Sequence, residues 1–132
     1  NVIKQIEGII RNISFKNTLS GKNPASFDSP ELRVIRDADR LDAIGAIGIA
    51  RAFNYGGFKN RKLYDPDIPP AFQQTKENYK NSAAPTINHF YEKLLLLKDR
   101  MHTKTGKKMA AKRHRFMERF LEEFYREWNS ID

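Results

Sequence analysis

Apolar residues recur at helical spacing along most of this 132-residue chain, and this period constrains the fold more than any other feature. Positions i, i+3, i+4 and i+7 share one face of an α-helix, whereas a half-buried strand needs a period of two, which no stretch sustains. We therefore expect an all-α protein. Three buried apolar stripes predict helices over about residues 2–13, over about residues 86–102, and from beyond Gly106 to the end of the chain. Their apolar positions are Ile6, Ile9, Ile10 and Ile13; Ile87, Phe90, Tyr91, Leu94, Leu97 and Met101; and Met109, Phe116, Met117, Phe120, Leu121, Phe124, Tyr125 and Trp128.

A further helix is predicted to begin at Ser29-Pro30-Glu31 and to run to about Phe53. The serine can cap it, the proline suits its first turn, and the glutamate favours the positive end of the helix dipole. Its surface is rich in small residues, including Gly45 and Gly48. Because glycine costs about 1 kcal/mol relative to alanine inside a helix, these two indicate that another backbone or a ligand approaches closely. The sequence at 55–57 is expected to end this helix.

The remaining segments predict connections. Residues 14–30 are rich in Ser, Asn, Gly and Lys and indicate a long surface connection, while residues 58–84 indicate an irregular excursion with room for one short helix. Arg61, Lys62 and Tyr64 lie in this excursion. A substrate lid is one interpretation of them, but solvated loop residues are the commoner case.

The composition limits the chemistry. Cysteine is absent, so disulfides and thiolate metal ligands are excluded, and any metal would be held by histidine and carboxylate groups, as Mn or Mg can be. The sequence has no run of 18 apolar residues and no pattern of a secretory signal. We therefore expect a cytoplasmic protein with no membrane partner, and 39% hydrophobic residues suffice for one modest core.

The net charge of +8 is concentrated in one stretch, since residues 98–115 carry eight Lys or Arg and a single acid, Asp99. Such a cluster attracts phosphate-bearing molecules, whether nucleotides or nucleic acid. A solvated basic helix face is the commoner explanation of a charge run.

The most informative string runs from Arg36 to Gly45, and it places Asp39 and Asp42 three residues apart on one helix face. That face also carries apolar side chains, so we expect it to be buried. A buried carboxylate needs a cation or a metal as partner. An internal ion pair with Arg36 or Arg40 and a metal site are both open from spacing alone, with the ion pair favoured.

The part of this string from Asp37 to Gly45 resembles the final motif of the HD superfamily of metal-dependent phosphohydrolases, in which an aspartate in an Ala-Asp-Lys/Arg context completes the metal site. The likeness is to a small bacterial group within that superfamily and covers nearly the whole chain. It implies an HD-domain-like helical bundle that lacks its first helices, with residues 1–132 as the C-terminal portion of a single domain. Further matching segments are 13–15, 47–53, 55–57, 63–66, 87–98, 113–114, 116–117, 124–125 and 127–128.

The resemblance implies that Asp39 is a catalytic metal ligand and that Asp42 is a supporting carboxylate, which orients a neighbouring ligand or a bound water. It also implies a His and an adjacent His-Asp pair upstream, but this sequence has no His-Asp pair, and its histidines all follow Asp39. We expect the missing ligands before Asn1, where the sequence starts without Met and inside a helical pattern. One carboxylate holds a divalent ion poorly, so we expect this chain alone to bind metal weakly and to be inactive.

In the intact relative, the resemblance implies metal-assisted hydrolysis of a nucleotide or another phosphorylated small molecule, for example of a nucleoside triphosphate to monophosphate and pyrophosphate. His89 and Lys93 lie four residues apart, so they share a helix face and are candidates for binding the substrate phosphates. A structural histidine beside an apolar stripe is at least as common. This interpretation requires Asp39 to lie inside a helical pocket. A carboxylate that is open to solvent, or held by a neighbouring guanidinium with no cavity beside it, would overturn it.

Two alternatives remain open. One is a basic helical domain that binds nucleic acid through residues 98–115. The other is a non-catalytic interaction domain that keeps only the helical scaffold. The oligomeric state is not indicated by the sequence.

Overall fold

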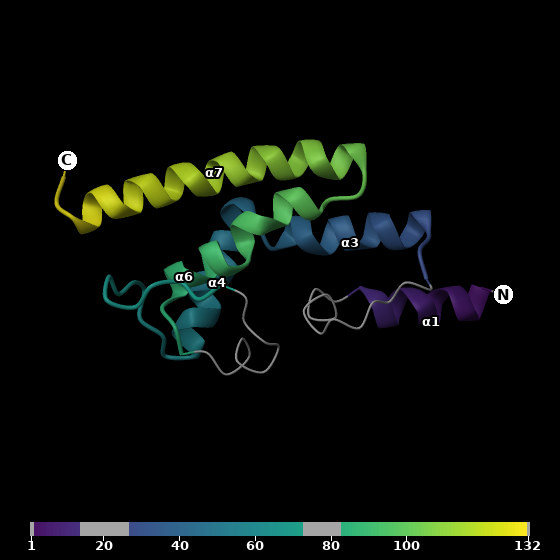
Figure 1. Ribbon diagram of the computed structural model, residues 1–132, viewed down its shortest axis with the longest axis horizontal. Coiled ribbons are helices and arrows are strands. Elements are labelled where there is room, and N and C mark those ends of the chain that lie inside the picture. Colours follow the sequence, from purple (N-terminus) through teal and green to yellow (C-terminus); the bar gives the residue numbers. More distant parts are fainter. Residues whose placement is uncertain (1, 14–26, 73–82, 132) are drawn as a thin grey trace.

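The computed structural model describes residues 2–13, 27–72 and 83–131, and these residues form helices and connections without a strand (Figure 1). The predicted all-α class is therefore confirmed. Most of the expected connection over 14–30, and the part of the 58–84 excursion at 73–82, lie outside the described residues. None of the helices in the described part of the chain is long and apolar enough to cross a membrane. The helices are α1 Val2–Asn12, α3 Pro30–Asp42, α4 Gly45–Phe58, α6 Thr86–Glu92, the 3-10 helix η1 Leu94–Arg100, and α7 Lys104–Trp128.

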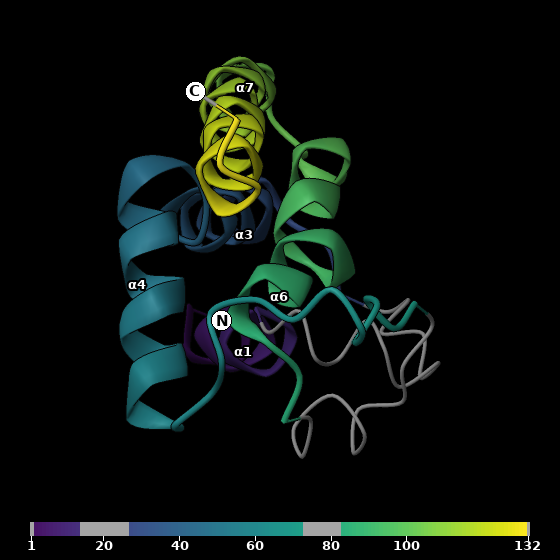
Figure 2. The same cartoon turned by 90° about the vertical axis from the view of Figure 1, so that its left-hand side faces the viewer.

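The long α7 lies along α3, and together they pack against α4 on one side and the α6–η1 segment on the other. Figure 2 shows this arrangement from the end of the molecule, with α4 and η1 on opposite sides of α3 and α7 above. The core fills the space between these helices. It consists of Leu41, Ile44, Ile49, Ile87, Phe90, Leu94, Leu97, Met101, Ala110, Met117 and Leu121.

The predicted start of α3 is confirmed. The Oγ of Ser29 accepts a hydrogen bond from the amide of Leu32 at 3.1 Å, and Pro30 opens the first turn. The prediction of one helix to Phe53 is wrong, because the chain turns at residues 43–45 and a second helix, α4, continues to Phe58. Gly45 adopts a φ of 76°, a left-handed conformation that favours glycine, and this lets the chain change direction without strain.

Close approach explains Gly48, as the sequence indicated. A Cβ at Gly48 would lie 2.2 Å from the carbonyl oxygen of Ala43, so only glycine lets α4 fold back against the end of α3. Gly56 has a similar role at the other end of α4, where a Cβ would lie 2.1 Å from the hydroxyl of Thr86 on α6. Gly56 and Gly57 are inside α4, so the prediction that they end the helix is wrong.

The predicted helix over 86–102 is divided in two. The α-helical α6 ends at Glu92, Lys93 leaves the helical conformation at φ −141° and ψ −59°, and η1 follows. The buried positions still follow the predicted stripe, because both parts pack on the same core. In α7 the interruption predicted at Gly106 is wrong. The helix starts at Lys104, and the hydroxyl of Thr103 caps it by accepting from the amide of Gly106 at 2.9 Å.

Two of the predicted buried stripes are partly exposed. In α1 no residue is buried, and Ile6 and Ile10 are 50% and 67% exposed, so the first stripe is an apolar surface in the described structure. The α1 helix touches α3 through a hydrogen bond from the guanidinium of Arg36 to the carbonyl of Asn12 at 3.0 Å. In α7, Met109 and Phe116 are 41% and 42% exposed, and the core side of that helix is formed by other positions of the stripe.

Residues 59–72 are irregular but fixed at several points. The amides of Thr86 and Ile87 donate to the carbonyls of Lys62 and Leu63 at 2.9 and 3.0 Å. The ring of Tyr64 packs edge-on against rings near the end of α7, namely Phe124, Tyr125 and Trp128. This part of the excursion is therefore held against both α6 and α7.

The contrast between two glycines of α4 tests the packing at the turn. Gly48→Ala should destabilise the protein by about 1–3 kcal/mol, because the added methyl group meets a backbone carbonyl that cannot move aside cheaply. Gly57→Ala is the matched control: nothing lies within 4 Å of its Cβ position, so the change should be neutral or stabilise the helix by up to about 1 kcal/mol. Urea unfolding followed by circular dichroism measures both, and equal effects would contradict the close contact.

Candidate functional site

The buried carboxylate of α3 belongs to Asp37, which is only 3% exposed. One of its oxygens accepts from the amide of His102 at 2.8 Å, and the other accepts from the amide and the hydroxyl of Thr103, both at 2.7 Å. Burial would raise the pKa of Asp37, but these hydrogen bonds outweigh it and hold the pKa below its usual value. Asp37 is thus a structural anion that ties α3 to the start of α7.

Asp39 and Asp42 are both exposed, so the expectation that they occupy a buried face is wrong. Residues two apart point about 200° away from each other around a helix, and the inward position of Asp37 therefore turns Asp39 outward. Asp39 has no hydrogen bond or ion pair with the described residues. Asp42 forms an ion pair with Arg51 of α4.

The ion pair favoured from spacing, between Asp39 and a neighbouring arginine, is also wrong. The guanidinium of Arg36 binds the carbonyl of Asn12. Arg40 is buried, donates to the carbonyl of Arg100, and lies 3.0 Å from Nε2 of His102. Both arginines therefore join helices together and leave the carboxylate of Asp39 available.

The described residues do not form a metal site by themselves. No group of three or more His, Asp or Glu side chains among residues 2–13, 27–72 and 83–131 is placed to hold a metal ion. His102 lies 3.0 Å from the guanidinium of Arg40, and His114 lies 3.1 Å from the carboxylate of Glu118. A metal bound by Asp39 would need its other ligands from outside these residues.

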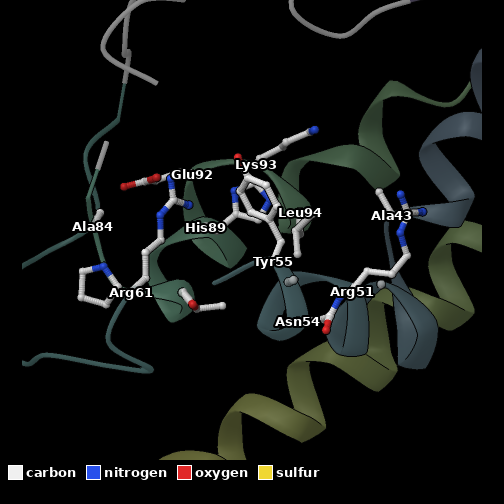
Figure 3. A pocket seen from close by; sticks show the side chains of 14 residues that line it. Ala43, Arg51, Asn54, Tyr55, Arg61, Ala84, His89, Glu92, Lys93 and Leu94 are labelled. Atoms are coloured by element: carbon white, nitrogen blue, oxygen red, sulfur yellow. The ribbon is translucent and has the colours of Figure 1, made fainter. Parts of the chain in front are cut away.

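A basic cavity of about 620 Å³ lies between α4 and α6 (Figure 3). Among the described residues, its charged walls are Arg51 of α4, Arg61 of the irregular segment and Lys93 at the end of α6, together with the acid Glu92. In Figure 3, Arg61 and Arg51 stand on opposite sides of the view, with His89, Tyr55 and Lys93 between them. One carboxylate oxygen of Glu92 accepts a hydrogen bond from the amide of Ala71 at 2.9 Å, so this acid is partly engaged by the backbone. The cavity therefore favours an anionic ligand.

The structure brings His89 and Lys93 into this one cavity, although their roles stay predictions. Burial, together with the nearby charges of Lys93 and Arg61, lowers the pKa of His89 to about 4. His89 is therefore neutral at pH 7 and offers one N–H donor, while the cationic groups supply the charge.

The cavity meets α3 at Ala43, the residue that follows the last turn of that helix. Asp39 precedes Ala43 by four residues, so the two lie on one face, about one helical turn apart. The exposed carboxylate of Asp39 does not line the cavity. It lies on the same face of α3 as Ala43, which does line it.

Sequence reasoning missed Arg51 and gave Arg61 little weight. A signal for Arg51 was present, because Gly48, Arg51, Ala52 and Tyr55 are spaced as one helix face, and all four line the cavity. Arg61 had no such signal, since only the path of residues 59–72 brings it to the cavity. Of its neighbours, Lys62 is exposed and pairs with Asp65 at 2.7 Å, and Tyr64 packs against α7.

Two carboxylates on one helix give a matched test of burial. Asp37→Ala should destabilise the protein by about 2–4 kcal/mol at pH 7, because it leaves buried amide donors without an acceptor. Asp39→Ala should change stability by less than about 0.5 kcal/mol, because the side chain is exposed. Urea unfolding of the 132-residue chain measures both, and a larger loss for Asp39→Ala would contradict the assigned orientation of α3.

The lowered pKa of His89 leads us to expect that the folded protein loses stability in acid. The pKa of His89 is about 4 in the folded protein, below the ordinary histidine value of 6.5, so its effect is absent above pH 6.5 and grows as the pH falls toward 4. The full contribution is at most about 3 kcal/mol. His89→Gln should reduce the difference in unfolding free energy between pH 7 and pH 4.5. An unchanged difference would show that His89 titrates normally.

No protein-family model matches the sequence. The Bacillus subtilis protein YpgQ is 38% identical over 125 residues, which are 94% of this chain and 52% of YpgQ. The crystal structure of YpgQ in complex with ADP matches with a TM-score of 0.60 and 39% identity, over 75% of this chain and 44% of that one.

Two further crystal structures agree with the same fold. A protein from Lactobacillus plantarum matches with a TM-score of 0.87 and 45% identity, over 96% of this chain and 60% of that one. An HD-superfamily hydrolase from Bacillus thuringiensis matches with a TM-score of 0.64 and 54% identity, over 76% of this chain and 47% of that one. The chain spans about half the length of the curated relative YpgQ. By sequence and by fold, the chain is therefore similar to about half of YpgQ and to part of an HD-superfamily hydrolase.

Proposed function

We propose that this chain is the Asp39-bearing part of an HD-type phosphohydrolase that acts on nucleotides. The observation that carries the proposal is the position of Asp39 about one helical turn from Ala43, where α3 reaches the basic cavity. The described residues leave this carboxylate exposed and do not form the pocket expected around it, so the proposal requires groups from outside them to enclose it. A carboxylate for a metal and a cationic pocket for phosphates are the two parts that metal-assisted phosphate hydrolysis needs. A nucleic-acid binder would have no use for their being adjacent.

The charge of the cavity supports a polyphosphate ligand. Arg51, Arg61 and Lys93 reach it from three different segments, so they surround an anion instead of meeting it from one side. Guanidinium groups bind phosphate oxygens with two N–H groups at once, and Lys93 adds a compact charge. The complex of YpgQ with ADP supports a nucleotide as the ligand class.

Asp42 has a role in this proposal that differs from the one the resemblance implied. Its ion pair with Arg51 fixes a cavity cation at the junction of α3 and α4. We therefore assign Asp42 to positioning Arg51, while Asp39 is the metal ligand. The remaining ligands would come from outside the described residues, since these do not supply them.

The proposal is tested in a longer form that carries the sequence preceding Asn1, by following pyrophosphate release from nucleoside triphosphates with Mn²⁺. Asp39→Ala should lower kcat by at least about a hundredfold with the fold intact, because a ligand of the ion is lost. Lys93→Ala should mainly raise KM by about tenfold, because it removes one phosphate-binding charge.

The control is Lys107→Ala, an exposed lysine of α7 that does not line the cavity, and it should leave both constants unchanged. Full activity in Asp39→Ala, or the same KM in Lys93→Ala and the control, would overturn the proposal. Release of inorganic phosphate in place of pyrophosphate would keep the phosphohydrolase class but change the bond cleaved.

A further inference from the structure

Five cations form a continuous stripe along the outer side of α7: Lys104, Lys108, Lys112, Arg115 and Arg119. We call this set the α7 stripe. Steps of four, four, three and four residues keep the set within about 80° around the helix. At 1.5 Å per residue the stripe is about 22 Å long. The sequence predicted a basic cluster here, and the helix converts it into a straight line of charge.

The cations of the α7 stripe are turned to solvent. All five residues are exposed, and none forms an ion pair with the described residues. Their orientation follows from packing, because the opposite side of α7 is buried through Ala110, Met117 and Leu121. In both views α7 lies at the outside of the molecule, with α3 beneath it (Figure 1). The charges therefore repel one another without an ion pair from the described residues, which favours an external polyanion.

The α7 stripe is distinct from the basic cavity, since no residue that lines the cavity comes from α7. Acids appear on α7 only from Glu118 onward, and that glutamate faces His114. Four cations of the stripe, Lys104 to Arg115, precede these acids, and Arg119 lies between Glu118 and Glu122. The stripe is thus a separate basic surface that the proposed hydrolase activity does not use.

We propose that the α7 stripe binds the sugar–phosphate backbone of duplex nucleic acid. A duplex presents a rigid line of negative charge, and a straight row of exposed cations can neutralise several phosphates of one strand. The stripe consists only of Lys and Arg, so it fits binding through phosphates without reading the bases.

An anionic membrane surface fits less well. A membrane-binding helix buries a broad apolar face in the lipid, but the apolar face of α7 is already in the protein core. Beside the stripe, Met109 and Phe116 are the exposed large apolar residues of this part of α7, and each is less than half exposed. The guanidinium of Arg119 also lies over the ring of Phe116, 5.9 Å from its centre, which covers part of that ring.

The test is fluorescence anisotropy of the 132-residue chain with a labelled DNA duplex over a range of salt concentrations. The wild-type affinity should fall with salt at a log–log slope of about 4, as expected for five cations that each displace a counterion. Lys108→Glu/Lys112→Glu should weaken binding at least about tenfold and reduce the slope by about 2. Both positions are exposed, so circular dichroism should show an unchanged fold.

Lys4→Glu/Lys59→Glu is the matched control, because it changes the net charge equally at exposed positions away from α7. It should change the affinity less than threefold, and Lys93→Ala should leave binding intact, which separates the stripe from the cavity. Equal losses in both double variants would mean a general charge effect and would overturn the proposal. Absence of duplex binding at low salt, or binding to phosphatidylserine vesicles in its place, would also overturn it.

Discussion

The structure depends on one buried anion, the carboxylate of Asp37. It accepts three hydrogen bonds from His102 and Thr103, and in this way it connects the middle of α3 to the residues just before α7. Gly106 leaves the space that the carboxylate occupies, since a Cβ there would lie 2.3 Å from Oδ2 of Asp37. Arg40 adds a second connection from α3 to the same segment. These contacts fix the orientation of α3 about its own axis.

The exposure of Asp39 follows from that rotation. Because positions 37 and 39 point in nearly opposite directions, a helix that buries one must expose the other. From the sequence, the face that carries Asp39 and Asp42 was expected to be buried, because apolar side chains share it. In the structure, the inner face of α3 instead carries Asp37 and Arg40 beside Leu41. The burial of Asp37 and Arg40 depends on partners that lie 60 or more residues along the chain.

Local signals in the sequence predicted local structure well. The cap at Ser29, the apolar period of α6 and η1, and the close approach at Gly48 are properties of a few neighbouring residues, and the structure confirms each of them. The helical period of apolar residues continues through both the turn at Gly45 and the change of helix type at Lys93. This period therefore predicted neither of them. The cavity follows the same rule. His89 and Lys93 could be paired by spacing, but Arg61 joins them only because residues 59–72 are held against α6.

The ion pair between Arg51 and Asp42 connects the cavity to the exposed side of α3. Arg51 lines the cavity and is also held by a carboxylate on the exposed side of α3. The guanidinium has five N–H groups, so an anion that enters can share Arg51 with Asp42. Its charge would then lie close to Asp42, three residues from Asp39, and filling of the cavity would change the electrostatic potential on that side of α3.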